Sequence, residues 1–335
     1  DQGAGVAVFN ATAARLQATG CRFQGNTADV AFGLGGAIYC DSASTLQLDA
    51  CLLDDNSLPQ GRGGALYLAA AVRAELVNCT FTQNYAGNPG RGGAIYHDSD
   101  STVRLVHCTV VRNRTDTRDS SSGGGMYLTA RALAVLSHCL FASNTGTDFD
   151  IGLVDQTSRL VSAGYNLIDR TAWDTQPQFP AATDQIALGL GSTRLEPLQQ
   201  YGGILPMVGL GTFSVAVDVG DPNDTLLTDA RGLPRRGRSD IGAYERQEVE
   251  IQAPEAVLCP TSDTVTLGPL VIRDETGGAI LPGEDQVLIL LLPEGVEFVP
   301  GEGIPFELGS GTSLIGGLMN LDVVILIYDR NKTLC

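Results

Sequence analysis

A strict internal spacing in the first half of the chain limits most strongly how this sequence can fold. An aromatic residue that ends a GGAIY-like motif is followed twelve residues later by a cysteine, and five residues after that by an asparagine. Four full copies are present, and an earlier, weaker copy begins with GVAVF. The aromatic positions are Phe9, Tyr39, Tyr67, Tyr96 and Tyr127; the cysteines are Cys21, Cys51, Cys79, Cys108 and Cys139; the asparagines are Asn26, Asn56, Asn84, Asn113 and Asn144.

This repeat of 28–31 residues, with one loop of variable length, predicts the coils of a right-handed parallel β-helix. A single coil cannot bury its apolar side alone, so coils stack and form a continuous core. Stacking places equivalent residues about 4.8 Å apart in columns, and a slip of one residue turns inward side chains outward. We therefore expect ladders of tyrosine, cysteine and asparagine through about six or more coils.

The second half of the sequence loses the strict spacing. Residues 1–250 are predicted to form the β-helix, ending in irregular coils and a cap, because an open solenoid end exposes strand edges and apolar core. Residues 251–335 contain runs such as TVTLGPLVIRD and LDVVILIYD between glycine and proline turns, which predict an immunoglobulin-like β-sandwich. That fold usually has about seven strands in roughly 100 residues, so this shorter module is expected to be incomplete. The predicted class is all-β throughout.

Two sets of motifs resemble those of bacterial surface proteins. GGAI alternating with FQGN, FTQN and FASN is similar to the repeats of polymorphic outer-membrane proteins. SAGYNLI, PLQQYGG and DARGLPRRGRSDIGAYE resemble the tail of surface β-helix proteins called choice-of-anchor proteins. The resemblance implies an extracellular or cell-surface protein, and it implies no reaction.

The charge balance disfavours some classes of partner. The formal net charge is −17, whereas a protein that binds nucleic acid needs a basic face, and anionic membranes likewise attract basic segments. The apolar run VLILLL is far too short to span a bilayer. We expect no nucleic-acid partner and no transmembrane segment.

Two histidines are candidates for a transition-metal site. His107 and His138 precede the column cysteines of adjacent coils, so their Cβ atoms should lie about 5 Å apart on the outer surface. Two imidazoles can share a metal. The same column offers only Ala50 and Asn78 as neighbours, so no third ligand is evident, and a solvated surface pair is the alternative.

An acidic cluster is a candidate for calcium, which takes six to eight oxygen ligands. A solvated loop is one alternative, and a network of ion pairs that involves Asp229, Arg231, Arg235 and Asp240 is another. The candidate calcium ligands are Asp218, Asp221, Asp224 and Asp229.

The column cysteines are expected to be free thiols. In-register stacking places their Cβ atoms farther apart than the roughly 3.8 Å that a disulfide prefers, although a secreted protein permits disulfides. Cys40 follows a ladder tyrosine and is expected to point outward. In the second module, Cys259 and Cys335 form either a disulfide or two free thiols, and the sequence leaves both alternatives open.

No enzymatic role is expected, and a polysaccharide lyase or glycoside hydrolase is the alternative. Glycoside hydrolysis needs two carboxylates at a defined separation, and Asp41 and Asp98 share a column but lie two coils apart. Elimination chemistry on acidic polysaccharides needs a base in a basic cleft, and Lys332 is the only lysine of the chain.

The sequence favours a structural role outside the cell, as a surface fibre or filament subunit that assembles head to tail, or as the rod segment of an adhesin. The first coil begins close to the start of the sequence, and exposed strand edges are templates for pairing with another chain. A contact of this kind that does not close gives a filament. Alternatively, the chain is a processed product or a part of a longer protein, or it binds or cleaves polysaccharides.

Overall fold

The computed structural model of the 335-residue chain describes residues 14–29, 31–116, 122–146, 150–155, 157–169, 181–186, 191–211 and 213–247, and the backbone of short strands outside these ranges. The chain divides into two compact units, Asp1–Arg246 and Gln247–Cys335. Every described regular element is a strand, so the predicted all-β class is confirmed.

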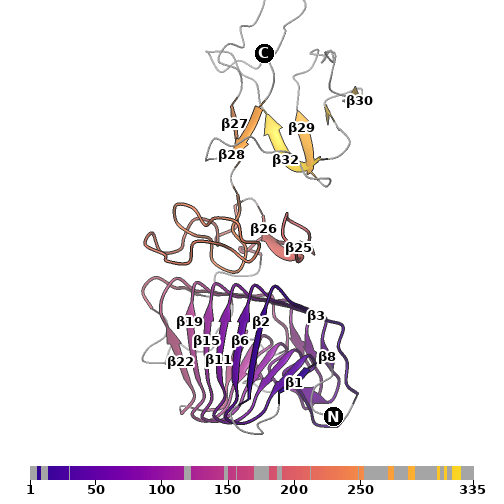
Figure 1. Cartoon of the computed structure of the whole chain (residues 1–335), viewed down its shortest axis with the longest axis vertical. Helices are drawn as coiled ribbons and strands as arrows, with labels where there is room; N and C mark the ends of the chain where they lie inside the picture. The colour runs from indigo at the N-terminus through magenta and orange to yellow at the C-terminus, as the bar shows by residue number, and fades with distance from the viewer. Residues whose placement is uncertain are drawn as a thin grey trace, which may run out of the picture. The chain divides into compact units, whose positions relative to one another are not determined.

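The first unit is a parallel β-solenoid of three sheets, in which successive coils add strands side by side (Figure 1). Sheet 1 has the order β1 (Val6–Val8), β5 (Ile38–Cys40), β10 (Leu66–Leu68), β14 (Ile95–His97), β18 (Met126–Leu128) and β21 (Ile151–Leu153). Sheet 2 has the order β2 (Arg15–Thr19), β6 (Thr45–Asp49), β11 (Arg73–Val77), β15 (Thr102–Val106), β19 (Leu133–Ser137) and β22 (Arg159–Ser162). Sheet 3 has the order β24 (Gln185–Ile186), β23 (Leu167–Ile168), β20 (Leu140–Ala142), β16 (Thr109–Val111), β12 (Thr80–Thr82), β7 (Leu52–Asp54) and β3 (Arg22–Gln24).

Shorter parallel pairings extend the coils beyond sheet 3. One small sheet contains β8 (Ser57–Leu58), β13 (Tyr85–Ala86) and β17 (Arg114–Thr115), and another pairs β4 (Gly33–Leu34) with β9 (Gly61–Arg62). These strands lie in the variable part of the repeat, so even that part keeps some register between neighbouring coils.

Inward side chains of the three sheets form one continuous core. Leu48, Leu76, Leu105 and Leu136 hold equivalent register positions in sheet 2 and are almost completely buried. Full burial of one leucine contributes about 1.5–3 kcal/mol, and the column repeats that contribution in each coil. The stacking of coils therefore supplies the core that a single coil lacks.

The asparagine ladder is a chain of side-chain amides at the corner after sheet 3. Nδ2 of Asn26, Asn56, Asn84 and Asn113 donates to Oδ1 of the next asparagine at 2.8–2.9 Å. Each accepting Oδ1 also takes the backbone N–H of the preceding asparagine. Asn144 ends the ladder by donating to the carboxylate of Asp150 at 2.7 Å. Buried amides and turn N–H groups are thus satisfied in every coil.

The tyrosine ladder lies on the face of sheet 1 opposite to Ile38 and Cys40, and it still belongs to the same buried cluster. The rings of Tyr39, Tyr67, Tyr96 and Tyr127 stack with centroids 4.9–5.7 Å apart. The guanidinium groups of Arg62 and Arg91 lie 5.4 Å and 4.9 Å from the rings of Tyr96 and Tyr127. Each arginine adds a cation–π contact. The four tyrosines are at most 6% exposed.

The first coil departs from the expected ladder. The register pairs Tyr39 with Ala7 and not with Phe9. Arg15 follows Ala7 by eight positions, whereas its register partner Thr45 follows Tyr39 by six. The spacing of twelve from Phe9 to Cys21 therefore does not reflect the register, because the paired positions of the first coil lie two residues farther apart in the sequence than those of the second. Phe9 itself lies outside the described residues.

The cysteines that the structure describes are free thiols, and all except Cys21 are buried. The outward orientation expected for Cys40 is wrong. Cys40 is fully buried and shares an inward column with Leu68, His97 and Leu128. Successive strand residues face opposite sides, so the outward position of Tyr39 turns Cys40 inward.

The C-terminal part of the first unit lies against the side of the solenoid. The antiparallel pair β25 (Leu195–Gln199) and β26 (Met207–Leu210) begins this part. Its residues 195–246, called here the C-terminal segment, share a second apolar core with outward residues of sheet 3. That core contains Val111, Leu140, Ala142, Leu167, Val208, Leu210, Ala216 and Ile241. We expected irregular coils and a cap here; β23 and β24 do continue sheet 3, but the C-terminal segment covers its apolar outer face.

The second unit contains three described strand pairs. They are β27 (Val249–Gln252) with β28 (Val271–Asp274), antiparallel; β29 (Gln286–Leu290) with β32 (Met319–Ile325), parallel; and β30 (Leu308–Gly309) with β31 (Ser313–Leu314), antiparallel. The immunoglobulin-like sandwich stays a prediction. Cys259 and Cys335 lie outside the described residues.

Candidate functional site

The residue before each column cysteine turns the chain from sheet 2 into sheet 3. Ala50, Asn78, His107 and His138 occupy this corner with φ between 48° and 53°, the left-handed region in which asparagine and histidine are enriched. The imidazoles of His107 and His138 stack with centroids 4.4 Å apart and an interplanar angle of 18°. Tyr165 extends the aromatic column, 5.1 Å from His138.

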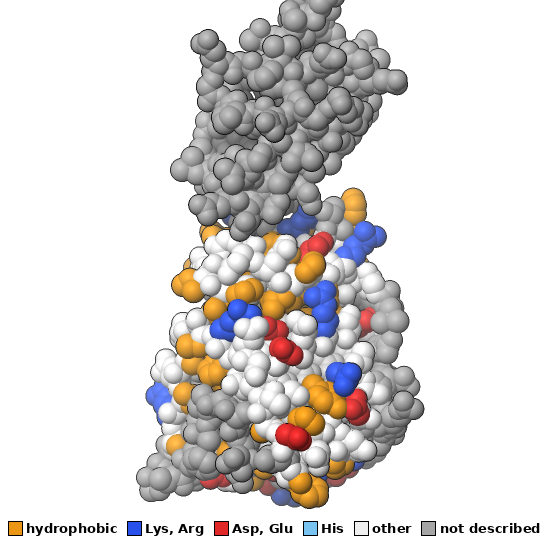
Figure 2. Space-filling view, turned by 90° about the vertical axis from the view of Figure 1, so that its right-hand side faces the viewer, with side chains coloured by type: hydrophobic (Ala, Val, Ile, Leu, Met, Phe, Trp, Pro, Cys, Tyr) orange, Lys and Arg blue, Asp and Glu red, His pale blue; other side chains and the backbone are white. Residues whose placement is uncertain are grey.

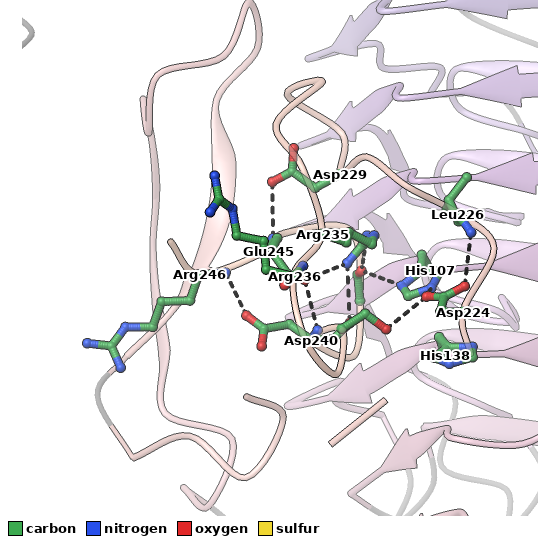
Figure 3. Close-up of polar contacts among 12 residues, drawn as sticks. His107, His138, Asp224, Leu226, Asp229, Arg235, Arg236, Asp240, Glu245 and Arg246 are labelled. Carbon is green, nitrogen blue, oxygen red and sulfur yellow. Dashed lines mark hydrogen bonds and ion pairs between the residues drawn. The ribbon is translucent and has the colours of Figure 1, made fainter. Parts of the chain in front are cut away.

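The alternative that this histidine pair is solvated at the surface is wrong. His107 is fully buried and His138 is only 6% exposed, because the C-terminal segment covers this corner (Figure 3). The backbone N–H of Gly242 donates to the carbonyl oxygen of His138 at 2.9 Å. The cluster therefore forms where two stretches that are far apart in the sequence meet.

Asp224 of the C-terminal segment supplies the third group that the sequence column lacked. Its Oδ2 lies 2.6 Å from Nε2 of His107, and the ligating atoms of His107, His138 and Asp224 all lie within 4.8 Å of one another. Two donors position the carboxylate: the Ser239 hydroxyl reaches Oδ2 at 2.8 Å, and the Leu226 backbone N–H reaches Oδ1 at 3.1 Å.

The remaining ring nitrogens are also oriented. Nδ1 of His107 lies 3.3 Å from the carbonyl oxygen of Gly242, and Nδ1 of His138 lies 3.0 Å from Oγ of Ser137. Nε2 of His138 accepts the backbone N–H of Asp221 at 3.0 Å.

Burial favours neutral imidazoles in this cluster. Burial lowers the pKa of His107 to about 4, against the opposing hydrogen bond to Asp224, and burial likewise lowers the pKa of His138. Burial acts to raise the pKa of Asp224, but hydrogen bonding to His107 and Coulomb attraction outweigh it and hold that pKa well below its ordinary value. Neutral imidazole and ionised carboxylate are the forms that bind metal ions.

The four aspartates proposed for calcium do not converge on one point. Among the described residues, only Asp224 of the four belongs to a group with metal-ligand spacing. Asp221 accepts the backbone N–H of Asn223, and the backbone N–H of Asp218 donates to Asp240. Asp229 forms a buried ion pair with Arg231 at 2.7 Å.

The alternative ion-pair network is present in part. Asp229 pairs with Arg231. Arg235 pairs instead with Glu245, a residue that sequence reasoning missed, and reaches only the backbone oxygen of Asp240. Arg235 donates to Glu245 at 3.1 Å, with both side chains buried, and to Oδ1 of Asn78 at 2.9 Å. Glu245 also accepts the backbone N–H groups of Arg236 and Asp240. The network thus attaches the C-terminal segment to the solenoid corner beside the histidines.

The carboxylates considered for catalysis bind the tyrosine ladder. Asp41 accepts the hydroxyl of Tyr39 at 3.1 Å, and Asp98 accepts that of Tyr67 at 2.7 Å. The register places Asp41 and Asp98 two coils apart, about two strand spacings of 4.8 Å.

A small pocket lies beside the tyrosine ladder. Its volume is about 220 Å³, and Phe32, Leu34, Arg62, Tyr67 and Pro89 are among its lining residues. The Phe32 side chain is 75% exposed, so an aromatic face is open to solvent there.

Comparison with known proteins supports the fold. Residues 1–151 match the family model described as a right handed beta helix region. No curated protein matches the chain significantly, and no solved structure does. The fold and the family match together define a parallel β-helix protein. None of the described residues forms a helix with the length and hydropathy needed to cross a membrane.

Proposed function

We propose that this chain is an extracellular structural protein whose solenoid is a rod segment of a surface fibre or adhesin. The observation that carries the proposal is the continuity of the ladders. The asparagine chain runs without a break from Asn26 to Asp150, and the tyrosine stack follows the same coils. Each coil is thereby tied to the next by side chains as well as by backbone pairing, which suits a stiff element.

The distribution of charge on the surface supports a structural role more than an enzymatic one. On the described part of the face in Figure 2, acidic and basic side chains are interspersed with neutral and hydrophobic ones, and neither sign gathers in one patch. The acidic total of −17 gives no general attraction for polyanions. We therefore propose a non-enzymatic role, in agreement with the resemblance to surface-protein tails.

Head-to-tail assembly through strand edges is the specific form that we propose. Strands β1, β2 and β3 each end the strand order of their sheets, so among the described residues their outer edges lack a strand partner. A second copy that pairs with these edges would extend all three sheets and the core columns together. Such a contact is heterologous and builds a filament.

The test is sedimentation velocity of the full chain over a range of concentrations. An inward-pointing charge on an edge strand blocks strand addition, and Ala18 of β2 packs against the core next to Leu48. Ala18→Lys should abolish concentration-dependent assembly. Gln17→Lys, on the outward side of the same strand, adds the same charge and should retain it. A wild-type chain that stays monomeric throughout contradicts the assembly proposal.

Polysaccharide binding is the second candidate, and the pocket beside Tyr67 favours it. An exposed aromatic ring next to an arginine offers a stacking face and a hydrogen-bond donor for a sugar ring. Phe32→Ala should weaken binding to a glycan array or remove it. Phe213→Ala, which removes a ring that is 79% exposed outside the pocket, is the matched control. Equal binding by both variants would exclude this pocket.

A further inference from the structure

We propose that His107, His138 and Asp224 bind a divalent transition-metal ion of the zinc type, which fastens the C-terminal segment to the solenoid. Two imidazole nitrogens and one carboxylate oxygen are the ligand types that zinc, cobalt and nickel prefer. The site would be structural, with two ligands from adjacent coils and one from a segment more than eighty residues later in the sequence.

The spacing of the ligand atoms suits a single small ion. The three atoms lie within 4.8 Å of one another, and the two imidazoles face the same way from one stacked column. Ligands at 2.0–2.2 Å around a tetrahedral ion are separated by about 3.3 Å. Closure around the ion needs two changes. The distance between Nε2 of His107 and Oδ2 of Asp224 must widen from 2.6 Å, and Nε2 of His138 must exchange its hydrogen bond from the Asp221 N–H for a metal bond. A fourth position is left for water.

The outer contacts suit histidines that bind a metal. Nδ1 of His107 lies 3.3 Å from the carbonyl oxygen of Gly242, and Nδ1 of His138 lies 3.0 Å from Oγ of Ser137. Metal-bound histidines usually donate their other N–H to a carbonyl or a hydroxyl, so both residues have an acceptor for the tautomer that leaves Nε2 for the ion. Without a metal, the other neutral tautomer of His107 donates Nε2–H to Asp224 at 2.6 Å.

A proton on Nε2 of His107 competes with the metal, because an Nε2–H group also satisfies the carboxylate of Asp224. The two differ at His138, because a metal ion takes Nε2 of His138 as a ligand, whereas the proton leaves that nitrogen with the backbone N–H of Asp221. The positive charge of Arg235, which donates to the Gly242 carbonyl oxygen, weakens attraction for a metal ion, but its ion pair with Glu245 offsets that charge.

A metal at this position would couple binding to the attachment of the C-terminal segment. Asp224 is held by Ser239 and Leu226 of the same segment, whereas both histidines belong to the solenoid. Binding to the assembled cluster and not to the detached segment stabilises the attached state in proportion to the logarithm of free metal.

The experiment uses the full chain, stripped with a chelator and titrated with Co²⁺ and Zn²⁺. We expect one ion per chain, a visible cobalt spectrum of a tetrahedral nitrogen–oxygen site, and a Tm that rises with added zinc. X-ray absorption of the zinc form should show nitrogen or oxygen neighbours near 2.0–2.1 Å and no sulfur near 2.3 Å. Sulfur neighbours, or no bound ion at micromolar metal, would overturn the proposal.

Two variants assign the site. Asp224→Asn keeps the size of the side chain and should lower zinc affinity at least about tenfold, whereas Asp218→Asn, which changes an acidic residue outside the cluster, should leave it unchanged. Circular dichroism of both apo proteins checks that they fold. If Asp224→Asn unfolds, His138→Gln serves in its place. Equal zinc affinity in the cluster variant and the control contradicts the site.

Discussion

The solenoid and the C-terminal segment are stabilised in different ways. In the solenoid each contact recurs: one asparagine amide bonds to the next in four successive steps. In the C-terminal segment each contact occurs once, as for Arg235 with Asn78 and Glu245 or Asp224 with His107. Loss of one asparagine of the ladder should therefore affect the neighbouring coils, whereas loss of one contact in the C-terminal segment should release that segment alone.

The largest expected effect is in the middle of the asparagine ladder. Asn113→Ala removes the acceptor of the Asn84 backbone N–H and side-chain amide, and three donated bonds. Each buried group left unpaired costs about 1–3 kcal/mol, so we expect a loss of about 5 kcal/mol in the free energy of unfolding, measured by urea denaturation. Asn26→Ala, at the partly exposed end of the ladder, should cost less than half as much. Equal losses of unfolding free energy in the two variants would contradict the prediction that the cost depends on position in the ladder.

The second effect should be confined to the C-terminal segment. Arg235→Ala leaves Glu245 with its two backbone N–H donors but without its ion-pair partner, and removal of one partner of a buried ion pair costs about 3–5 kcal/mol. We expect faster hydrogen exchange in residues 226–246, with unchanged protection in β11, β15 and β19. Arg131→Ala breaks an exposed ion pair with Asp100 and should change neither region. Global loss of protection in Arg235→Ala would contradict the independence of the two regions.

The third effect is a pH dependence within the C-terminal segment. Burial, and then the charge of Glu245, raise the pKa of Asp240 to about 7. Because the folded state holds this proton more tightly than the unfolded chain, its contribution is present below about pH 4 and is lost as pH rises toward 7. The loss is at most about 4 kcal/mol.

Other groups oppose this trend, since burial lowers the pKa values of the histidines. The difference in unfolding free energy between wild type and Asp240→Asn therefore isolates the contribution of Asp240. The unfolding free energy of wild type minus that of Asp240→Asn should fall between pH 4 and 7. A constant difference across this range would show that Asp240 does not titrate there. Asp240 is also contacted by Arg246, Asp218 and Arg235. These three residues therefore stay as in wild type in the variant.

The smallest effect has the opposite sign. His97 lies in an inward column between Leu68 and Leu128. Among the described residues, neither of its ring nitrogens has a hydrogen bond of normal geometry, although the backbone of Ser101 is near enough to affect its pKa. Burial lowers its pKa to about 3. His97→Leu should raise the free energy of unfolding at pH 7 by about 1–2 kcal/mol, measured in urea. Because the lowered pKa makes His97 destabilising as pH falls below about 6.5, the gain should be larger at pH 5. Destabilisation would indicate an unseen partner for His97.

The solenoid can be predicted well from the sequence, because constant intervals between the repeated residues specify which residues of neighbouring coils pair. The spacing from Tyr67 to Cys79 to Asn84 recurs in each neighbouring coil, so one inference covers many contacts. The spacing gives a wrong prediction at Phe9: the interval to Cys21 is twelve, but Tyr39 pairs with Ala7. It also misleads at Cys40, where alternation along the strand decides the orientation.

The histidine–aspartate cluster could be predicted only in part. Stacking of His107 on His138 follows from the repeat. The approach of Asp224, 117 positions away from His107, depends on an apolar face of sheet 3 that must be covered, and no local pattern specifies which loop covers it. The apolar outward residues Val111, Leu140, Ala142 and Leu167 are a sequence signal that this face needs a cover.

Electron microscopy of native extracellular material tests the central claim most directly. The account predicts rods or filaments outside the cell that are labelled by antibodies against this chain, with an axial repeat that matches one subunit if the edges assemble. Isolated rods or irregular cell-bound fibres would retain the structural role and exclude regular head-to-tail assembly. Labelling restricted to the cell interior, or to dispersed particles that act on glycans, would contradict it.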